Sequence, residues 1–477
     1  MRPWRFDFRV VRDAGVAQHT QLARALVHEI QRGRLLPGAT LPGSRTLATQ
    51  LGVNRKVVVA ALDELVVQGW LETRRGSGTR VAASLPRSAI ADVELPSSPR
   101  RATHVESDGG LAITDGLPDP RLAPQAELGR AYARALRFAA RSAAGYADPA
   151  GDAGLRAVLA AFVNQARGLS TTASDVFVTR GSQGALSLYA LAMLRPGDVV
   201  IAESPGYAPA WRAFELAGAT VVHVPVDAGG MRTDVLEKLA RKHAGKLKAV
   251  YATPHHQYPT SVALLPERRM ALLALAERFD FQILEDDYDY EYHFDGQPLL
   301  PLHATGAVGR VVYIASLSKV LAPAIRLGYV IGCPRTIARL KETREQLDRQ
   351  GDLVLERAIA ELVEDGVLQR HVRRARRAYA ERRDALLERL SASSALAEYF
   401  EYEVPAGGLA LWLRVRPGSI DGLVARAEAR GLRIQPGARH VPRGRLDAFR
   451  FGFASHTPAE LARICATLER CVSARPA

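Results

Sequence analysis

The sequence of 477 residues contains few cysteines, and their arrangement excludes two classes of protein. Cys333, Cys465 and Cys471 show no C-x-x-C spacing and have no histidine beside them. This excludes a disulfide framework and a cysteine-based zinc site. We expect all three to be small buried side chains.

Long apolar stretches are also missing. No segment reaches the roughly eighteen uninterrupted apolar residues of a membrane span. The Arg-rich start of the chain lacks the apolar core of a signal peptide. We therefore expect a cytoplasmic protein with no membrane partner.

Acidic residues are in deficit. The chain has 64 Lys and Arg against 50 Asp and Glu, a formal net charge of +14. Residues 1–84 carry 13 basic and 6 acidic residues, which is half of the excess in under a fifth of the chain. Such a charge favours a polyanionic partner, although basic surfaces also occur without one. The length predicts two or three domains.

Residues 1–84 have the pattern of a helix-turn-helix. A first helix is expected from about Thr20 to Gly33. Ser44 is expected to cap a two-turn helix, and residues 51–53 form a tight turn. Asn54 then caps a third helix that continues to Gln68. A helix pair of this kind either binds DNA or serves as a plain packing unit.

A basic, glycine-rich loop follows the helices between two short strands, 70–73 and 79–82, and is interpreted as a wing. The second helix of the motif would enter the major groove, while the first helix and the wing would contact phosphates and backbone. The residues expected at double-stranded operator DNA are Ser44, Arg45, Asn54, Arg55, Lys56, Arg74, Arg75, Gly76 and Gly78. Residues 85–110 are rich in Pro, Ser and Arg without periodicity, which predicts a flexible linker.

Residues 111–477 alternate β-branched apolar runs with Ala- and Leu-rich helical stretches. The expected strands include 176–178, 199–201, 249–251 and 281–284. This alternation predicts an α/β domain with a mainly parallel sheet covered by helices on both faces. From about residue 375 the pattern becomes helix, strand, helix, strand, which predicts a smaller α+β subdomain.

Lys319 follows a predicted strand that contains Val311, Val312 and Ile314. Parallel sheets place ligands at strand ends, so the lysine is a candidate for covalent attachment to an aldehyde. Ser316, Ser318 and Arg326 lie close in sequence and suit a phosphate. Alone, the pattern also fits a solvated surface lysine.

A second strand end carries complementary chemistry at Asp286 and Tyr288. An aspartate beside a pyridine nitrogen keeps that nitrogen protonated, and a tyrosine hydroxyl can bond a ring oxygen. Together with Lys319, these residues specify pyridoxal 5'-phosphate as the cofactor.

Three further stretches follow predicted strands. Gly181, Ser182 and Gln183 form a turn into a helix, where backbone N–H groups bind anions. Tyr207 could stack on a pyridine ring or simply pack. His255 and His256 lie in the third stretch; because no third ligand accompanies them in sequence, we expect no metal there.

These motifs resemble known families. Residues 41–45, 51–55 and 75–79 resemble the GntR type of winged helix, apart from Gly43, where a second serine is usual. The remainder resembles the fold-type I aminotransferases. Head, linker and body together resemble the MocR family of pyridoxal-phosphate-dependent transcriptional regulators, over nearly all of residues 15–470.

The resemblance implies a role for each site residue. Lys319 would bond the cofactor's aldehyde. The phosphate would be held by Ser316, Ser318, Arg326, Gly181, Ser182 and Gln183, with Tyr146 reaching the partner subunit's phosphate. Asp286 would pair with the pyridine nitrogen, Tyr288 would contact the ring oxygen and Tyr207 would stack. Tyr258 and Ser261 stand where the family usually has asparagine and glycine.

The resemblance also assigns Arg450 to the carboxylate of an effector, although an arginine in a strand can equally pair with a structural acid. It implies a homodimer, head-to-tail, with shared sites. Three functions follow: a regulator that senses pyridoxal phosphate or a small amino compound, an active aminotransferase with an accessory head, or a scaffold with a vestigial site. The winged helix and the retained site residues favour the regulator, with residual aminotransferase activity.

Overall fold

The computed structural model describes residues 16–31, 33–74, 78–85, 111–139, 146–307, 309–416 and 419–473. The chain divides into two compact units, residues 1–106 and 107–477, here called the head and the body. Residues 86–110 of the expected linker, and Arg75 and Gly76 of the expected wing, lie outside the described residues.

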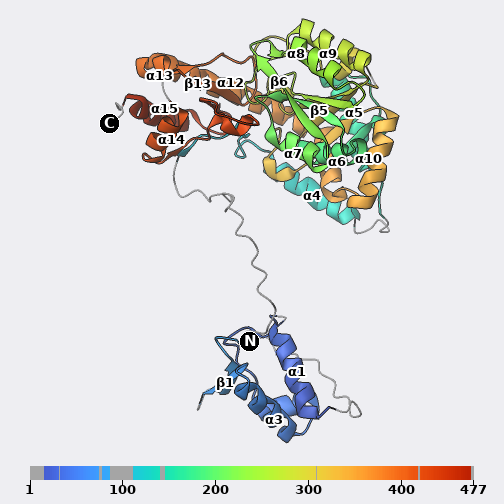
Figure 1. Ribbon diagram of the computed structural model, residues 1–477, viewed down its shortest axis with the longest axis vertical. Helices are drawn as coiled ribbons and strands as arrows, with labels where there is room; N and C mark the ends of the chain where they lie inside the picture. Colours follow the sequence, from blue (N-terminus) through green and yellow to red (C-terminus); the bar gives the residue numbers. More distant parts are fainter. Residues whose placement is uncertain are drawn as a thin grey trace. The chain divides into compact units, whose positions relative to one another are not determined.

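The head is a three-helix unit with a two-stranded antiparallel sheet (Figure 1). Its elements are α1 (Gln18–Gln31), α2 (Ser44–Leu51), α3 (Arg55–Val67), β1 (Leu71–Arg74) and β2 (Gly78–Val81). Apolar residues at helical spacing, including Leu22, Leu26, Leu47 and Leu65, are buried together with Leu71 in one core. The helix-turn-helix is therefore a folded element of the chain.

Of the two helix caps predicted in the head, the cap at Asn54 is present and the cap at Ser44 is not. Asn54 Oδ1 accepts the Lys56 backbone N–H at 2.9 Å and caps α3. The prediction that Ser44 caps α2 is wrong, because Gly43 occupies the cap position and has no side chain to accept a hydrogen bond. The Ser44 hydroxyl instead accepts a hydrogen bond from Arg55 Nε at 3.3 Å.

The body is built on an eight-stranded sheet with the order β4-β11-β10-β9-β8-β5-β6-β7. Neighbouring strands are parallel from β10 through β9, β8 and β5 to β6, whereas β11 and β7 run antiparallel to their neighbours. The strands are β4 (Val176–Thr179), β5 (Val199–Ser204), β6 (Thr220–Asp227), β7 (Gly230–Met231), β8 (Leu247–Ala252), β9 (Gln282–Asp287), β10 (Val311–Ser316) and β11 (Gly328–Ile331).

Helices cover both faces of this sheet, as Figure 1 shows for α8 and α9 against α6 and α7. One face packs on α6, α7 and α10. The other face packs on α8 and α9 and, at β4, β10 and β11, on the group formed by α4, α5 and α11. The helices are α4 (Gln125–Ala139), α5 (Ala153–Arg167), α6 (Gly181–Met193), α7 (Ala208–Leu216), α8 (Thr233–Lys242), α9 (Pro266–Phe279), α10 (Pro334–Leu347) and α11 (Leu353–Glu364). Because both faces are covered, the central strands β4, β5, β8 and β10 are mainly apolar.

The C-terminal part forms the expected smaller α+β subdomain around a three-stranded sheet, β12-β13-β15. Its elements are α12 (Val367–Ala392), α13 (Ser394–Tyr399), β12 (Phe400–Glu401), β13 (Ala410–Val415), α14 (Ile420–Glu428), β14 (Leu432–Arg433), β15 (Ala448–Gly452) and α15 (Pro458–Ser473). The short strand β3 (Leu111–Ala112) pairs with β14 and so brings the start of the body to this subdomain.

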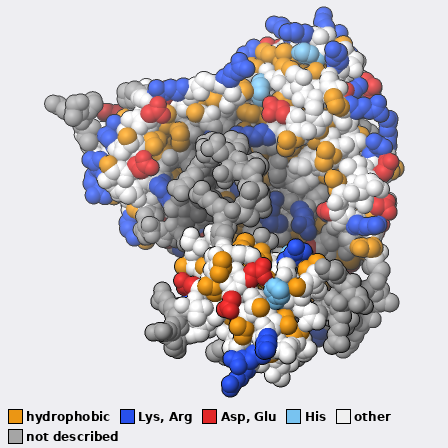
Figure 2. All heavy atoms as spheres, turned by 60° about the horizontal axis from the view of Figure 1, so that its bottom comes forward, with side chains coloured by type: hydrophobic (Ala, Val, Ile, Leu, Met, Phe, Trp, Pro, Cys, Tyr) orange, Lys and Arg blue, Asp and Glu red, His pale blue; other side chains and the backbone are white. Residues whose placement is uncertain are grey.

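Basic side chains are prominent on the surface of the body. Lys and Arg side chains lie around much of the edge of the body in Figure 2, with Asp and Glu between them. Among the described residues, no helix combines the length and the apolar character needed to span a bilayer.

Candidate functional site

Lys319, Asp286 and the turn at Gly181 lie at one edge of the sheet. β9 and β10 are parallel, with Asp286 opposite Ile314. Ser316 at the end of β10 lies opposite Gly328, which in turn lies opposite Thr179 at the end of β4. Ligands bind at the carboxyl ends of such strands. The fold therefore gathers Lys319, Asp286 and the turn at Gly181 from three separate segments.

Lys319 lies just beyond β10 and is half-buried. Lys319 Nζ donates to the Gly116 backbone carbonyl at 2.9 Å. Burial lowers the pKa of Lys319 to about 8, and the nearby Arg450 guanidinium acts in the same direction. A lysine with this pKa is partly neutral near physiological pH, which is the nucleophilic form.

Asp286 is buried and uses only one of its carboxylate oxygens. Oδ2 accepts from the Tyr251 hydroxyl at 2.8 Å, while Oδ1 has no hydrogen-bond partner. Burial raises the pKa of Asp286 to about 7. A buried acceptor without a donor costs free energy, so Oδ1 is suited to receive an N–H from a bound group.

An anion-binding corner lies at the start of α6. Gly181 has φ 71°, and a Cβ there would lie about 3.1 Å from the Arg326 guanidinium, so glycine permits this close approach. Arg326 Nη2 donates to the Arg180 carbonyl at 3.1 Å. The Ser316 hydroxyl accepts the Ser318 backbone N–H at 3.2 Å, and the buried Ser318 hydroxyl has no partner. A helix N-terminus beside a guanidinium and a free hydroxyl suits a phosphate.

The next two residues of α6, Ser182 and Gln183, are both half-buried. Ser182 lies in the first turn of the helix. Gln183 Nε2 donates to the Pro209 carbonyl at 3.1 Å, and its buried Oε1 has no partner. The Tyr207 ring is half-buried and meets the Tyr258 ring edge-on, with centroids 5.3 Å apart.

Arg450 projects from β15 into the same region and is almost fully buried. Its Nη1 donates to the Pro259 carbonyl at 2.7 Å, and its Nη2 lies 3.3 Å from the Tyr288 hydroxyl. Nε faces Asp115 Oδ1 at 3.6 Å but has no hydrogen-bond acceptor. Burial raises the pKa of Tyr288, which keeps its hydroxyl protonated. The guanidinium thus retains donor capacity for a carboxylate.

Tyr258 lies beneath this arginine. The Arg450 guanidinium is 4.8 Å from the centre of the Tyr258 ring, a cation–π contact. The Tyr258 hydroxyl bonds Asp115 Oδ2. Ser261, where the family usually has glycine, has φ 63° in the left-handed region, which explains why glycine suits this position.

Sequence reasoning missed several residues of the site. Asp115 and Gly116 come from the coil after β3 and reach Arg450, Tyr258 and Lys319. Glu203 is buried at the end of β5, where its Oε2 accepts the Thr253 hydroxyl at 2.8 Å, and burial raises its pKa to about 7. Only the Asp-Gly pair at 115–116 gave a local signal, that of a turn.

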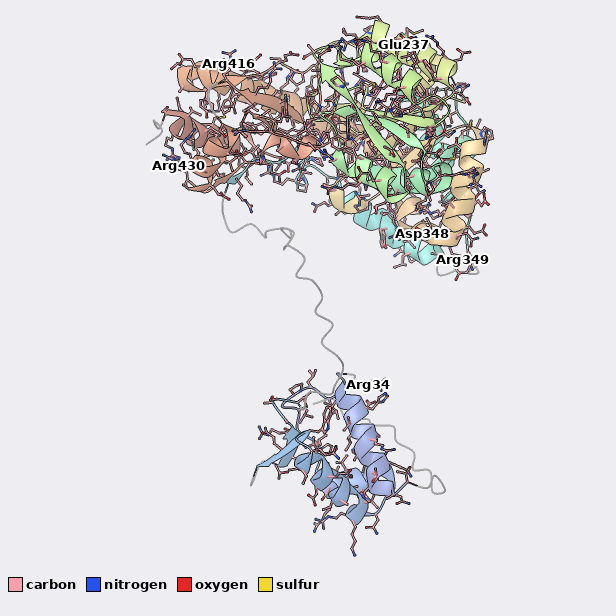
Figure 3. The ribbon with its side chains drawn as sticks, viewed as in Figure 1. Arg34, Glu237, Asp348, Arg349, Arg416 and Arg430 are labelled. Carbon is pink, nitrogen blue, oxygen red and sulfur yellow. The ribbon has the colours of Figure 1, made fainter. Side chains whose placement is uncertain are left out.

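Tyr146 is separate from these residues and exposed, with 78% of its surface accessible. The Arg349 guanidinium, at the end of α10 in Figure 3, lies 4.8 Å from the centre of the Tyr146 ring. No contact between Tyr146 and the Lys319 region appears within the described part of the chain.

The predicted DNA-facing residues of α2 and α3 lie together in the head. Asn54, Arg55 and Lys56 are exposed at the start of α3, with Arg45 exposed and Ser44 half-buried in α2. The contact between Arg55 and Ser44 joins the two helices there. Arg74 ends β1 and Gly78 begins β2, with φ 81° for the glycine.

The body's donor set fits pyridoxal phosphate chemically. The amine of Lys319 matches an aldehyde, and the unpartnered Asp286 Oδ1 matches a pyridinium N–H. The helix start at Gly181, with Arg326 and the free Ser318 hydroxyl, matches a phosphate dianion. The requirements of three parts of one molecule are therefore met at one sheet edge.

Comparison with known proteins agrees with both units. The family described as bacterial regulatory proteins, gntR family, matches residues 18–81, and aminotransferase class I and II matches residues 119–468. A structure of the α-aminoadipate aminotransferase LysN from Thermus thermophilus, complexed with N-(5'-phosphopyridoxyl)-L-leucine, is 28% identical with a TM-score of 0.70 over 76% of this chain and 92% of that one. Fold and site thus define a GntR-type head joined to an aminotransferase class I and II body.

Relatives that match along nearly the whole chain narrow this class. The probable rhizopine catabolism regulatory protein MocR of Rhizobium meliloti is 31% identical over 90% of this chain and 88% of its own length. The pyridoxine biosynthesis transcriptional regulator PdxR of Corynebacterium glutamicum is 32% identical over 95% and 96%. The chain belongs to the MocR-type regulators.

Proposed function

We propose that the protein is a pyridoxal-phosphate-dependent, DNA-binding transcriptional regulator whose signal is a small amino compound or pyridoxal phosphate itself. One observation carries the proposal: a single chain combines an exposed, capped helix start for reading DNA with a half-buried amine and a buried carboxylate that fit the cofactor. A regulator that reads chromosomal DNA works in the cytoplasm. The domain assignment is 1–84 for DNA binding, 85–110 for the linker and 111–477 for sensing and dimerisation.

The cofactor is pyridoxal phosphate, and when bound it supplies an electrophilic aldehyde carbon and an electron-withdrawing ring. The Lys319 amine would hold the aldehyde carbon, and Asp286 Oδ1 would accept a hydrogen bond from the protonated ring nitrogen. Tyr288 would donate a hydrogen bond to the ring oxygen, and Tyr207 and Tyr258 would border the ring. The phosphate would be held by Arg326 and Ser318, with Ser316, Gly181, Ser182 and Gln183.

The effector's carboxylate is assigned to Arg450. Its guanidinium already has one acidic neighbour, Asp115, whose side chain is 19% exposed and belongs to a coil rather than to the sheet. We infer that an incoming carboxylate takes the place of Asp115. Displacing Asp115 would also move Gly116, whose carbonyl holds Lys319. Effector binding is then coupled to the cofactor-bearing lysine.

Arg450→Lys should weaken binding of a carboxylate-bearing effector by about tenfold or more, because lysine keeps the charge but loses the bidentate geometry. Effector titrations followed by cofactor absorbance measure this. Arg414→Lys is the matched control: Arg414 lies on the neighbouring strand β13 and pairs with Glu401 at the surface. Equal affinities in both variants would contradict the assignment.

Asp115→Asn should act in the opposite direction. The amide keeps the size of the side chain but removes the charge that competes for Arg450. Because partly exposed ion pairs contribute at most about 1 kcal/mol, effector affinity should rise about two- to fivefold. The same titration measures it, and a loss of affinity would show that Asp115 binds the effector instead of competing with it.

A homodimer with head-to-tail subunits and shared sites is part of the proposal. Exposed Tyr146, and the apolar side chains of Tyr132 and Leu136 that α4 presents to solvent, support a subunit contact on this side of the body. In such a dimer Tyr146 would reach the partner's cofactor phosphate. Paired heads would bind paired half-sites on DNA.

An active aminotransferase with an accessory head is the second candidate, favoured by the Lys319 pKa of about 8, which suits proton transfer. One experiment separates the two. Footprints on operator DNA are recorded with cofactor alone and with added amino compounds, and keto-acid release is assayed in parallel. A changed footprint without turnover supports the regulator, whereas steady keto-acid release with an unchanged footprint supports the enzyme.

A further inference from the structure

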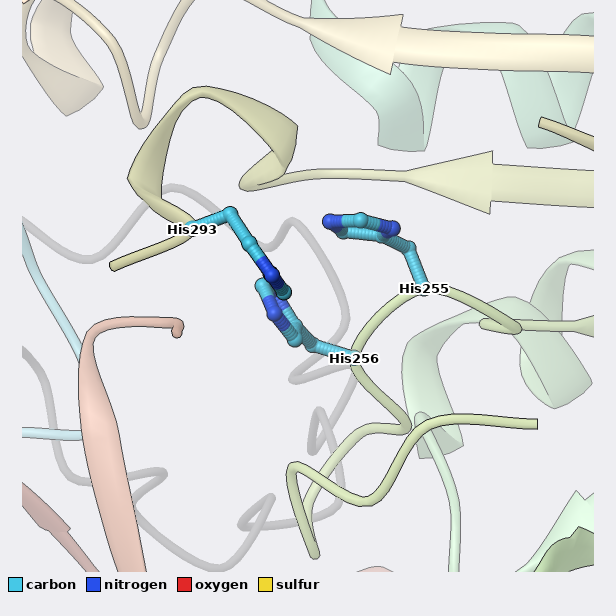
Figure 4. Close-up of side chains that lie close together, drawn as sticks. All are labelled: His255, His256 and His293. Atoms are coloured by element: carbon cyan, nitrogen blue, oxygen red, sulfur yellow. The ribbon is translucent and has the colours of Figure 1, made fainter. Parts of the chain in front are cut away.

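Three histidines that serve no role in the cofactor site meet in the body. His255 and His256 follow β8, and His293 follows the short helix η2 (Tyr290–Tyr292). One ligand nitrogen from each lies within 4.8 Å of the others. Figure 4 shows the His293 and His256 rings side by side with His255 beside them. From the sequence we expected no metal here, because no third ligand accompanies His255 and His256. The fold brings His293 to them as a third ligand.

The three imidazoles have unused nitrogen atoms. His255 Nε2, His256 Nε2 and His293 Nδ1 are all buried and have no hydrogen-bond partner. His255 and His256 are only 8% and 3% exposed, so these nitrogens lie inside the body. Buried polar atoms without a hydrogen-bond partner are rare in folded proteins, so each of them needs an explanation. Three such atoms in one cluster indicate a ligand that the three histidines share.

Asp289 orients the most buried of the three rings. Asp289 Oδ1 lies 2.8 Å from His256 Nδ1. A carboxylate on one ring nitrogen makes that nitrogen the proton-bearing one and leaves the lone pair on the other, Nε2. This carboxylate–histidine arrangement is the usual outer layer of a metal site. The unpartnered Nε2 of His256 is therefore the nitrogen available to a metal ion.

The surroundings leave room for an ion. A cavity of about 270 Å³ is lined by the three histidines and by polar Gln297 and Glu403. Gly407 lets the backbone come close, since a Cβ there would lie 2.8 Å from His256 Nε2. Glu403 and Gln297 belong to coil segments that border the cavity and offer oxygen atoms or a path for water.

We propose that His255, His256 and His293 bind one divalent transition-metal ion of the zinc class. Neutral imidazole is a preferred ligand of such ions, and three imidazoles plus a fourth oxygen ligand complete a tetrahedron. Zinc–nitrogen bonds of about 2.0 Å place tetrahedral ligand atoms about 3.3 Å apart. Small side-chain rotations bring the nitrogens from within 4.8 Å to this spacing. The ion ties the segment after β8 to the segment after β9.

The test uses the untagged, cofactor-loaded full chain after chelator treatment and removal of free cofactor. Titration calorimetry with Zn²⁺ should give one ion per chain, and Co²⁺ should give the visible absorption of a tetrahedral site. His293→Ala should weaken binding more than about a hundredfold, and Asp289→Asn about ten- to a hundredfold. His223→Gln is the matched control, since His223 also has a buried unpartnered Nδ1 but lies against Trp211.

The proposal fails if the wild-type chain binds no Zn²⁺ above background, or if His293→Ala and His223→Gln bind alike. Circular dichroism verifies that each variant is folded. X-ray absorption of the zinc-loaded wild-type chain needs no variant: fewer than three imidazole ligands would also overturn the assignment. Packing of three neutral rings without an ion is then the remaining role of the cluster.

Discussion

Lys319→Ala is expected to abolish covalent retention of pyridoxal phosphate. The amine lies just beyond β10 at the ligand-binding edge of the sheet, and burial has lowered its pKa to about 8. Alanine leaves the phosphate and ring contacts in place but removes the bond. Cofactor affinity should fall at least about a hundredfold, or by more than about 2.7 kcal/mol. Absorbance spectra and borohydride fixation followed by peptide mapping measure the loss.

Lys341→Ala is the control for this experiment, because Lys341 lies on α10 and pairs with Asp148 at 2.9 Å away from the strand ends. The wild-type chain adds a pH criterion. Since only the neutral amine attacks, capture of cofactor should accelerate as the pH rises toward about 8 and then level off. A borohydride-fixed residue other than 319 would refute the assignment. DNA binding by the head should survive the substitution.

The double variant Arg55→Ala/Lys56→Ala should lower operator affinity by about a hundredfold or more. Both side chains are exposed at the start of α3, where a recognition helix meets the major groove. Loss of base and phosphate contacts costs about 1–3 kcal/mol each. If both residues contact phosphates, the slope of log affinity against log salt should decrease by about two. Fluorescence anisotropy at several salt concentrations measures both quantities.

Arg34→Ala provides the matched control. Arg34 lies just beyond α1 in the head, as Figure 3 shows, and is ion-paired with Glu29 at 3.3 Å. Its removal changes the charge of the head by one unit without altering α2 or α3. If this control and the double variant weaken DNA binding equally, the effect comes from net charge and α3 is not the reading helix.

Much of the fold could be predicted from local sequence patterns. The apolar runs at 176–178, 199–201 and 249–251 lie in strands of the central sheet, and the run at 281–284 begins one residue before β9. Strands covered on both faces are rich in apolar residues, and such runs leave a recognisable pattern in the sequence. The Asn54 cap was also predictable, because capping depends on residues only two or three positions apart. Ser44 failed as a cap because the helix begins one residue earlier than the capping pattern required.

Contacts between distant segments could not be predicted from the sequence. Asp115 reaches Arg450 and Tyr258 across more than a hundred residues, and nothing near Asp115 in sequence marks it as a site residue. His293 follows η2 and belongs to a different segment from His255 and His256. Only the packing of the two segments brings the three rings together. The pKa of Asp286, raised to about 7, likewise reflects burial that no local pattern reports.

The amino-acid sequence by itself determined which chemical groups are present and on which element each lies: a lysine after one strand, an aspartate in another, a glycine turn before a helix, and a capped helix in a basic head. These depend on short-range periodicity and capping. The tertiary structure alone decided which groups face one another, which carry unsatisfied atoms and which have shifted pKa values. Those properties arise from desolvation and close contact between segments that the chain keeps far apart.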